Sequence, residues 1–234
     1  MKPLFYAPDM ATRHELPEEE SQHCTRVLRL KEGDEITVTD GKGHLYTAIL
    51  TDIHPKHCSV EIAREQATEP FGNFRIHIAV APAKQADRME WFVEKATEIG
   101  ISEITCLRCR YSERREMKLQ RLHKIAVSAM KQSQQTRLPQ IHEMTDFEDF
   151  ITLRFEGCKM FGHCREEGPK QPVREIYRPG TNALLLIGPE GDFSSGEINA
   201  ALEAGFLAVS LGKNRLRTET AALVACHTIH VLNR

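Results

Sequence analysis

The chain has 234 residues, of which 41% are hydrophobic and 27% are charged, and its formal net charge is −2. This composition is typical of a globular protein with one large domain or two modest ones, and it excludes a disordered or fibrous chain. No apolar run approaches the roughly 20 residues that span a bilayer, and the start, MKPLFYAPD, lacks the apolar core of a secretory signal. We therefore expect a cytoplasmic protein with no membrane partner.

The seven cysteines are odd in number and follow no regular framework. In a reducing compartment they are most simply explained as buried or free thiols. Cys106 and Cys109 form a CxxC motif, but a zinc site needs a second pair of ligands at suitable spacing, and the sequence offers none. We therefore predict no metal.

Charge is distributed unevenly along the chain. Residues 1–73 carry a net charge of −5, residues 74–137 carry +6, and residues 138–234 carry −3. Cations are densest between Arg108 and Arg137, where nine Lys and Arg face only Glu113 and Glu116. Such a segment favours contacts with nucleic-acid phosphates, although a charged helix face that is merely solvated is the alternative.

Residues 1–70 have the pattern of a small β-domain. Alternating segments at 34–39, 45–50 and 58–62 are separated by turn residues, at the spacing of small barrels. Residues 23–30 could form a short helix before the first of these strands. A linker is expected at 65–73, which contains Pro70 and Gly72.

Residues 74–234 alternate between strand and helix patterns. Strands are expected at 74–81, 101–107 and 158–161, and helices with an apolar face at 87–99 and 118–132. This alternation predicts a parallel α/β domain from 74 to 234.

The segment 184–222, LLLIGPEGDFSSGEINAALEAGFLAVSLGKNRLRTETAA, predicts two strand–loop–helix units. A buried strand at 184–187 ends at the loop Gly188-Pro189-Glu190-Gly191, and Ser194 and Glu197 have the spacing of a capping box for the next helix. A second strand at 207–211 leads into Gly212-Lys213-Asn214-Arg215. Thr218 can then cap a final helix that runs to Leu232.

Both loops are candidate ligand-binding segments. If the two strands lie in one parallel sheet, the loops meet at the same edge, where ligands of open α/β sheets bind. Gly188, Gly191 and Gly212 would let the backbone approach a ligand closely, although each glycine alone could simply make a turn. Apolar walls that could enclose a flat ring come from Leu186, Ile187, Leu211 and Leu216. The pattern is neither a P-loop nor a GxGxxG dinucleotide motif.

The segments IGPEGDFSSGEI and SLGKNRLRTETAALVA together resemble the paired signature of the 16S ribosomal RNA uracil-N3 methyltransferases. This family belongs to the SPOUT class, whose C-terminal chain forms a trefoil knot. The segment HCTRVLRLKEGD resembles the N-terminal PUA-like barrel of the same family, so the resemblance covers nearly the whole chain. It implies an α/β fold in which a PUA-like, RNA-binding β-barrel over 1–70 precedes a knotted SPOUT domain with a parallel sheet over 74–234.

The resemblance also implies a cofactor, S-adenosyl-L-methionine, held by the two loops and the start of the last helix. The residues expected to bind it are Leu186, Ile187, Gly188, Pro189, Glu190, Gly191, Leu211, Gly212, Leu216, Thr218 and Ala221. The substrate would be N3 of one uridine, position 1498 in the standard numbering, in the 16S RNA of the small ribosomal subunit. A homodimer formed through the last helix is expected from the same resemblance.

Methylation of uracil N3 requires removal of a weakly acidic proton while the nitrogen attacks a sulfonium methyl group. We expect Glu219 to be the base or an orienting group and Arg217 to stabilise charge on the uracil oxygens. The alternative is an Arg–Glu ion pair that only braces the loop, with Glu219 favoured at a helix N-terminus.

RNA contacts are expected from both parts of the chain, through His23, Arg26, Arg29, Arg114, Arg121, Lys124 and Arg137. The segment Lys131 to Pro139 resembles the EQSxR…P segment of the family with two departures. Lys131 stands where the family has Glu, and Gln135 stands where it usually has Arg. Two other functions remain open, namely ribose 2′-O-methylation of RNA by a SPOUT enzyme and a non-catalytic RNA-binding assembly factor.

Overall fold

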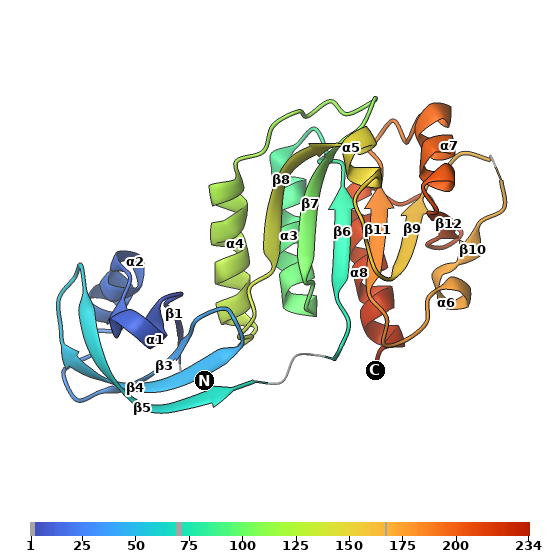
Figure 1. Cartoon of the computed structure of the whole chain (residues 1–234). Helices are drawn as coiled ribbons and strands as arrows, with labels where there is room; N and C mark the ends of the chain where they lie inside the picture. Colours follow the sequence, from blue (N-terminus) through green and yellow to red (C-terminus); the bar gives the residue numbers. More distant parts are fainter. Residues whose placement is uncertain (1–2, 69–71, 167) are drawn as a thin grey trace. The chain divides into compact units, whose positions relative to one another are not determined.

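The computed structural model describes residues 3–68, 72–166 and 168–234, and the chain divides into two compact units. The first contains residues 1–70 and 127–138, and the second contains residues 71–126 and 139–234. The boundary therefore falls within helix α4 (Leu119–Gln132). Both units are drawn in Figure 1.

The first unit is built on a curled, mixed five-stranded sheet. Its strand order is β1-β3-β4-β5-β2, with β1 and β3 parallel and the other neighbours antiparallel. The strands are β1 (Leu4–Tyr6), β2 (Glu15–Leu16), β3 (Glu35–Thr39), β4 (His44–Asp52) and β5 (Cys58–Ala67). Because β1 and β2 lie at opposite ends of this order, the sheet is a half-barrel rather than a closed barrel.

Alternating side chains of these strands form the core of the first unit. On β4, Tyr46, Ala48 and Leu50 are buried against Phe5 and Met10, as expected for a strand with one face toward the interior. The strands expected at 34–39, 45–50 and 58–62 are confirmed. The expected linker at 65–73 is wrong at its start, because β5 continues to Ala67; its residues 69–71 lie outside the described part of the chain.

The short helix expected at 23–30 is also wrong in its bounds and type. Short helix α1 (Met10–Arg13) comes first, and α2 (Glu18–Gln22) then begins after Pro17, with three glutamates in its first turn. The chain continues as a π-helix, η1 (His23–Val27), in which the amide of Leu28 donates to the carbonyl of His23. Arg29, with a positive φ of 53°, ends the helical segment.

The second unit contains a seven-stranded sheet in which every neighbouring pair is parallel, in the order β10-β12-β9-β11-β6-β7-β8. Its strands are β6 (Ile76–Val80), β7 (Glu103–Arg108), β8 (Gln140–Asp146), β9 (Cys158–Gly162), β10 (Gln171–Pro172), β11 (Ala183–Ile187) and β12 (Leu207–Ser210). The remaining helices are α3 (Ala86–Ile99), α5 (Phe147–Ile151), α6 (Val173–Ile176), α7 (Ser195–Glu203) and α8 (Thr218–Leu232). The predicted parallel α/β arrangement is confirmed.

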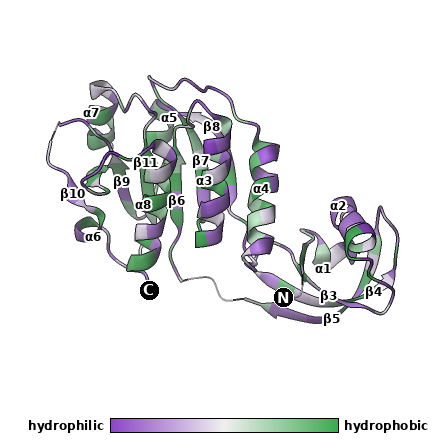
Figure 2. Cartoon of the chain, turned by 180° about the vertical axis from the view of Figure 1, so that it is seen from behind, coloured by the Kyte–Doolittle hydropathy of each residue, from purple (hydrophilic) through white to green (hydrophobic). Residues whose placement is uncertain are grey.

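Helices cover both faces of this sheet. On one face, α8 packs against α3, β6 and β11. On the other face, α5 and α7 bury Phe150 and Ile198 against Leu184 and Leu186 of β11. Figure 2 shows hydrophobic residues along α8 and along the strands that it covers. A central strand that helices cover on both faces has a continuous apolar sequence, and Ala183–Ile187 is such a strand. Among the described residues, each helix is too short or too polar to cross a membrane.

Gly157, just before β9, gives a test of the tight packing beside the central strands. Its φ is 149°, and a Cβ placed there would lie 2.3 Å from the carbonyl oxygen of Asn182. We expect Gly157→Ala to lower the free energy of unfolding by about 2–3 kcal/mol, because both strain and a backbone clash oppose it. Gly180 also has a positive φ, 79°, but an added Cβ would meet no atom within 4 Å. In urea unfolding, Gly180→Ala should therefore cost only about 1 kcal/mol, and equal losses in the two variants would contradict the packing explanation.

Candidate functional site

The two glycine-containing loops lie at the same edge of the parallel sheet. The first loop (residues 188–193) follows β11, and the second loop (residues 211–217) follows β12. Both strands are parallel to β9, which lies between them. The predicted meeting of the loops at the carboxyl edge is therefore confirmed, although the two strands are not direct neighbours.

Asp192 fixes the shape of the first loop. Its amide donates to the carbonyl of Pro189 over 2.9 Å, and its φ of 65° lies in the left-handed region. One carboxylate oxygen, Oδ1, accepts from the amide of Phe193, and Oδ2 accepts from the amide of Cys164 over 2.8 Å. The side chain therefore holds the first loop against the segment that follows β9.

Helix α7 begins with the predicted capping box. The hydroxyl of Ser194 accepts from the amide of Glu197, and the Glu197 carboxylate accepts from the amide of Ser194 over 2.7 Å. The other oxygen of Glu197 accepts from the amide of Arg110 over 2.8 Å. This carboxylate thus also connects α7 to the loop after β7.

Thr218 connects the first loop to the last helix. Its hydroxyl donates to the carbonyl of Gly188 over 3.2 Å, and its side chain is buried. The prediction that Thr218 caps α8 is wrong. Arg217 is the N-cap residue and makes no side-chain capping bond, because its guanidinium has no acceptor atom. The Thr218 hydroxyl is used for the contact with Gly188, 30 residues away in sequence.

Two of the predicted apolar walls lie together. A Cβ placed on Gly162, the last residue of β9, would lie 3.5 Å from Cδ1 of Ile187 and 3.7 Å from Cδ1 of Leu211. Gly162 therefore leaves a small gap between these two side chains at the carboxyl edge. The sequence prediction missed this glycine, and its position directly after the apolar strand at 158–161 is the signal that could have indicated it.

Leu186 is placed differently from Ile187. Its side chain is fully buried in the core with Phe161 and Phe193, so only its backbone can face a ligand. Leu216 and Ala221 are half-buried at the end of the second loop and in the first turn of α8.

Each predicted glycine has a specific neighbour or conformation. A Cβ on Gly188 would lie 3.1 Å from the ring of Phe193, and one on Gly191 would lie 3.0 Å from Cβ of Tyr111. Gly212 has a φ of 139° with open space around it, and its amide donates to the Ser210 hydroxyl. The first two glycines therefore permit close packing within the protein, whereas Gly212 leaves space open above the second loop.

The two predicted catalytic residues lie in different environments. Arg217 is exposed, and no ion pair joins it to Glu219 in the described structure. Glu219 is 9% exposed, and its Oε1 lies 3.9 Å from Nε of Arg88 on α3. Its Oε2 is buried without a hydrogen-bond partner among the described residues. The ion pair that braces Glu219 is thus formed by Arg88 and not by Arg217, which the sequence-based alternative predicts as the partner.

The loops after β6 and β7 border the first loop. Glu190 is exposed and accepts from the amide of Lys84 over 3.2 Å. The guanidinium of Arg114 donates to the carbonyls of Ala83 and Lys84, the shortest bond being 2.6 Å. A surface pocket there is lined only by charged residues, namely Lys84, Glu113, Arg114, Arg115 and Glu116. Arg114 therefore braces the loop after β6, and a charged surface lies beside the site.

Within the second unit, Arg121 is engaged by a carboxylate. Its guanidinium makes a bidentate contact with Glu90, and this hydrogen bond lowers the pKa of Glu90. Lys124 is exposed on the same helix.

In the first unit, Arg137 donates to the carbonyls of Lys42 and Thr68 over 3.0 and 3.2 Å. Arg26 and Arg29 are exposed there, and His23 is half-buried with its ring edge toward Phe5. Lys131, one of the two departures from the family pattern, pairs with Glu20 of the same unit. None of these arrangements tests RNA binding, which stays a prediction.

The CxxC motif is placed in the protein interior. Cys106 and Cys109 are both buried as free thiols. Burial raises the pKa of Cys106 to about 12 and also raises the pKa of Cys109. Thiols that are protonated at neutral pH are poor metal ligands and poor nucleophiles, so the pair fits a role in packing.

Comparison with known proteins identifies relatives over nearly the whole chain. Residues 71–230 match the family described as RNA methyltransferase domain, and residues 16–63 match the RNA methyltransferase PUA domain. Ribosomal RNA small subunit methyltransferase E of Rickettsia conorii is 30% identical over 88% of this chain and 84% of that protein.

Solved structures agree in fold. The crystal structure of a "probable rRNA-methyltransferase" from Porphyromonas gingivalis has a TM-score of 0.94 and 42% identity, covering 99% of this chain and 98% of its own. Ribosomal RNA small subunit methyltransferase E from Neisseria gonorrhoeae, solved bound to S-adenosyl methionine, has a TM-score of 0.87 and 30% identity with the same coverage.

The contact between Asp192 and Cys164 can be tested directly. We expect Asp192→Ala to speed hydrogen exchange at the Cys164 amide by about tenfold or more, because the amide loses a bond to a charged acceptor. Asp192→Asn is the matched control, since Asn tolerates a positive φ and keeps one acceptor oxygen. It should retain most of the protection. Unchanged exchange in the alanine variant would show that Asp192 does not hold the first loop against β9.

Proposed function

The chain belongs to the family of RNA methyltransferases that carry an N-terminal PUA domain, and on this premise we propose that it methylates N3 of the uridine at position 1498 in 16S ribosomal RNA, with S-adenosylmethionine as methyl donor. Its curated relatives are named for the RNA of the small ribosomal subunit. The observation that carries the proposal is the meeting of the two loops at one sheet edge, where the Thr218 hydroxyl at the start of α8 bonds to the Gly188 carbonyl of the first loop.

The residues of this edge fit the proposed methyl donor. Ile187 and Leu211 supply apolar surface on either side of Gly162, which suits a flat adenine ring. Backbone groups of Gly188, Pro189, Gly191 and Gly212 can approach a ligand at the two loops. The buried Oε2 of Glu219 has no partner among the described residues and can accept a hydrogen bond from a ligand. When bound, S-adenosylmethionine supplies an electrophilic methyl group on its sulfonium sulfur.

The protein residues then have to orient the uracil and manage its proton. In the reaction the S–CH3 bond breaks, the N3–CH3 bond forms, and the N3 proton leaves. Arg217, exposed at the start of α8, is placed to stabilise the negative charge that develops on the uracil oxygens. Glu219, held from one side by Arg88, presents its free oxygen as the proton acceptor or orienting group.

We further propose that two copies pair through α8, in the cytoplasm where ribosomal subunits are found. Val231 on α8 and Trp91 on α3 are large hydrophobic side chains with 48% and 41% exposure. Because α3 and α8 pack against each other, both residues belong to one helical layer of the second unit. Burial of these two side chains against a second copy would remove their apolar surface from water.

The activity can be tested with purified protein, S-adenosylmethionine and small ribosomal subunits that lack the modification. Nucleoside mass spectrometry should detect 3-methyluridine, with the methyl group on the base fragment. Arg217→Ala should lower turnover by about 10²–10³-fold, because a charge-stabilising group is removed, while binding of S-adenosylmethionine by calorimetry stays within a fewfold of the unchanged protein.

The same experiment separates the alternatives. A methyl group on the ribose fragment would identify a 2′-O-methyltransferase, and no product together with no cofactor binding would indicate a non-catalytic RNA-binding factor. Glu219→Gln keeps the size of the side chain, so a loss of turnover with an altered pH profile would mark Glu219 as the proton acceptor. A loss of turnover with an unchanged profile would mark it as an orienting group.

The first unit is expected to contribute phosphate contacts through Arg26. We expect Arg26→Ala to weaken binding to small subunits and to reduce the slope of log K against log salt by about 0.7–0.9, as for the loss of one phosphate contact. Arg13 is the control in the same unit, because its side chain is 74% exposed but lies 3.7 Å from Asp9. Arg13→Ala should leave the slope unchanged. Equal effects in filter-binding titrations of the two variants would indicate general attraction by net charge and not a specific contact of Arg26.

A further inference from the structure

A cluster of two histidines and one glutamate lies at the amino edge of the parallel sheet, where strands β6, β7 and β8 begin. His77 is the second residue of β6, Glu103 is the first residue of β7, and His142 is the third residue of β8. The glycine-containing loops follow the carboxyl ends of parallel strands, so they lie at the other edge. The function of those loops therefore does not explain the cluster.

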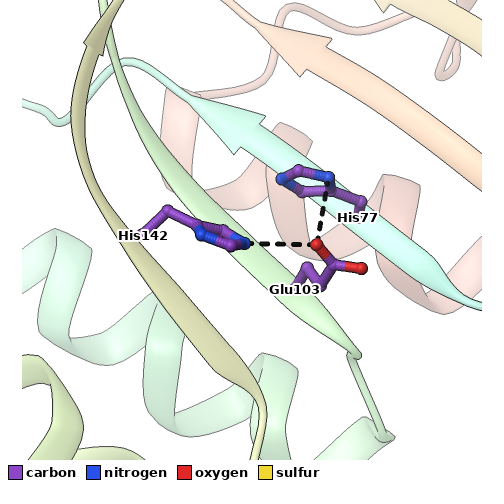
Figure 3. Close-up of side chains that lie close together, drawn as sticks. All are labelled: His77, Glu103 and His142. Atoms are coloured by element: carbon purple, nitrogen blue, oxygen red, sulfur yellow. Dashed lines mark hydrogen bonds and ion pairs between the residues drawn. The ribbon is translucent and has the colours of Figure 1, made fainter. Parts of the chain in front are cut away.

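Strand register brings the three side chains to one face of the sheet. His77 is paired with Glu103, and His142 is paired with Thr105, which is two residues after Glu103 on β7. Residues directly opposite each other in neighbouring strands share a face, as do residues two apart along a strand. Figure 3 shows the two imidazoles on either side of the carboxylate.

The potential ligand atoms lie close to one another. Oε2 of Glu103 is 3.1 Å from Nε2 of His142 and 3.7 Å from Nδ1 of His77, and the three ligand atoms lie within 4.8 Å of one another. Zinc bonds to imidazole nitrogen and carboxylate oxygen are about 2.0–2.2 Å long, so ligand atoms around one ion lie roughly 3–3.5 Å apart. Small side-chain rotations would bring the cluster to that geometry.

Neighbouring residues orient the potential ligands. Nε2 of His77 lies 2.8 Å from the hydroxyl of Thr105, and the ring of Phe150 packs edge-on against the imidazole. With Nε2 protonated toward Thr105, Nδ1 turns its lone pair toward the Glu103 carboxylate. A hydrogen-bonded second nitrogen and an apolar surround are typical of metal-binding histidines.

The geometry leaves space for a cation between Glu103 and His77. Oε2 of Glu103 and Nδ1 of His77 are 3.7 Å apart, which is longer than a hydrogen bond. With Nε2 of His77 protonated toward Thr105, the lone pair of Nδ1 faces this carboxylate oxygen. Arg75 approaches the opposite carboxylate oxygen, Oε1, over 3.4 Å, and its side chain is 64% exposed and well screened by solvent.

We propose that His77, Glu103 and His142 bind one divalent zinc ion, with water completing the coordination. Two imidazoles and one carboxylate form a recognised ligand set for zinc, whereas Mg²⁺ and Ca²⁺ prefer sets made only of oxygen atoms. The side chain of His142 is 32% exposed, which gives the ion a route from solvent. The ion would connect three adjacent strands at the amino edge and would take no part in methyl transfer.

The full-length protein, stripped with a chelator, can be titrated with Zn²⁺ alone in competition with a chromophoric zinc indicator. One equivalent is expected to bind, and His142→Ala should weaken this site by roughly 100-fold or more, because removal of a ligand should cost at least as much as the loss of an outer-shell partner, which costs about 10–100-fold. Because His142 is partly exposed, the variant is expected to fold, which circular dichroism can verify. Zinc should raise the melting temperature of the unchanged protein and not that of the variant.

A second histidine pair provides the control for adventitious binding. The rings of His54 and His57 stack at 4.3 Å in the first unit, and His57 lies 4.0 Å from Asp52. His57→Ala should therefore bind one equivalent as tightly as the unchanged protein does. The proposal is overturned if the unchanged protein binds no zinc, if binding is insensitive to His142→Ala, or if it is lost in His57→Ala.

Discussion

All seven strands of the larger sheet run in the same direction, and this constraint determines where the loops of the candidate site lie. Segments that leave the strands at their carboxyl ends all emerge at one edge, so residues near 84, 110, 162, 190 and 212 can meet there although they are far apart in sequence. The hydrogen bond from Thr218 to Gly188 then fixes the last helix to the first loop. A site built in this way depends on the register of the strands and not on any single loop.

Local patterns in the sequence were sufficient for much of this site. The glycines, the apolar strands and the capping box of Ser194 and Glu197 are short-range features, and each is found where its pattern predicted it. Strand order is not a local property, so the position of β9 between β11 and β12 could not be predicted, and with it the role of Gly162. The environment of Glu219 could not be predicted from the sequence either, because its partner Arg88 lies on another helix.

Two errors in the prediction have different physical causes. Thr218 has the residue type of a helix cap, but it is the first residue of α8, and its hydroxyl bonds to the carbonyl of Gly188 on the first loop. The π-helix at 23–27 has no pattern of its own that distinguishes it from the ordinary helix expected there. The trefoil knot stays a prediction, as do the RNA contacts.

The basic segment between Arg108 and Arg137 illustrates why a count of charges overstates the cations that are free to bind RNA. Arg108 pairs with Asp146, Arg121 with Glu90, and Lys131 with Glu20, while Arg114 and Arg137 donate to backbone carbonyls. The side chains of Arg108 and Arg121 are 42% and 66% exposed, and ion pairs of exposed side chains are worth only about 0–1 kcal/mol, whereas Lys131 and Glu20 are largely buried. Arg121 can therefore exchange Glu90 for a phosphate at little cost, whereas Arg137 would have to leave carbonyls that it bridges within its own unit.

The two edges of the parallel sheet differ in what surrounds their buried polar side chains. At the carboxyl edge, the buried polar groups Thr218 and Glu219 adjoin the loops where a ligand is expected, so contacts with a ligand can offset the cost of burying them. At the amino edge, His77 is 8% exposed and shares its surroundings with a carboxylate and a second imidazole, although the two glycine-containing loops lie at the other edge. Apolar residues at these positions would avoid the cost of desolvating three polar side chains. Binding of a cation offsets that cost, because the carboxylate and both imidazole nitrogens then interact with one positive charge.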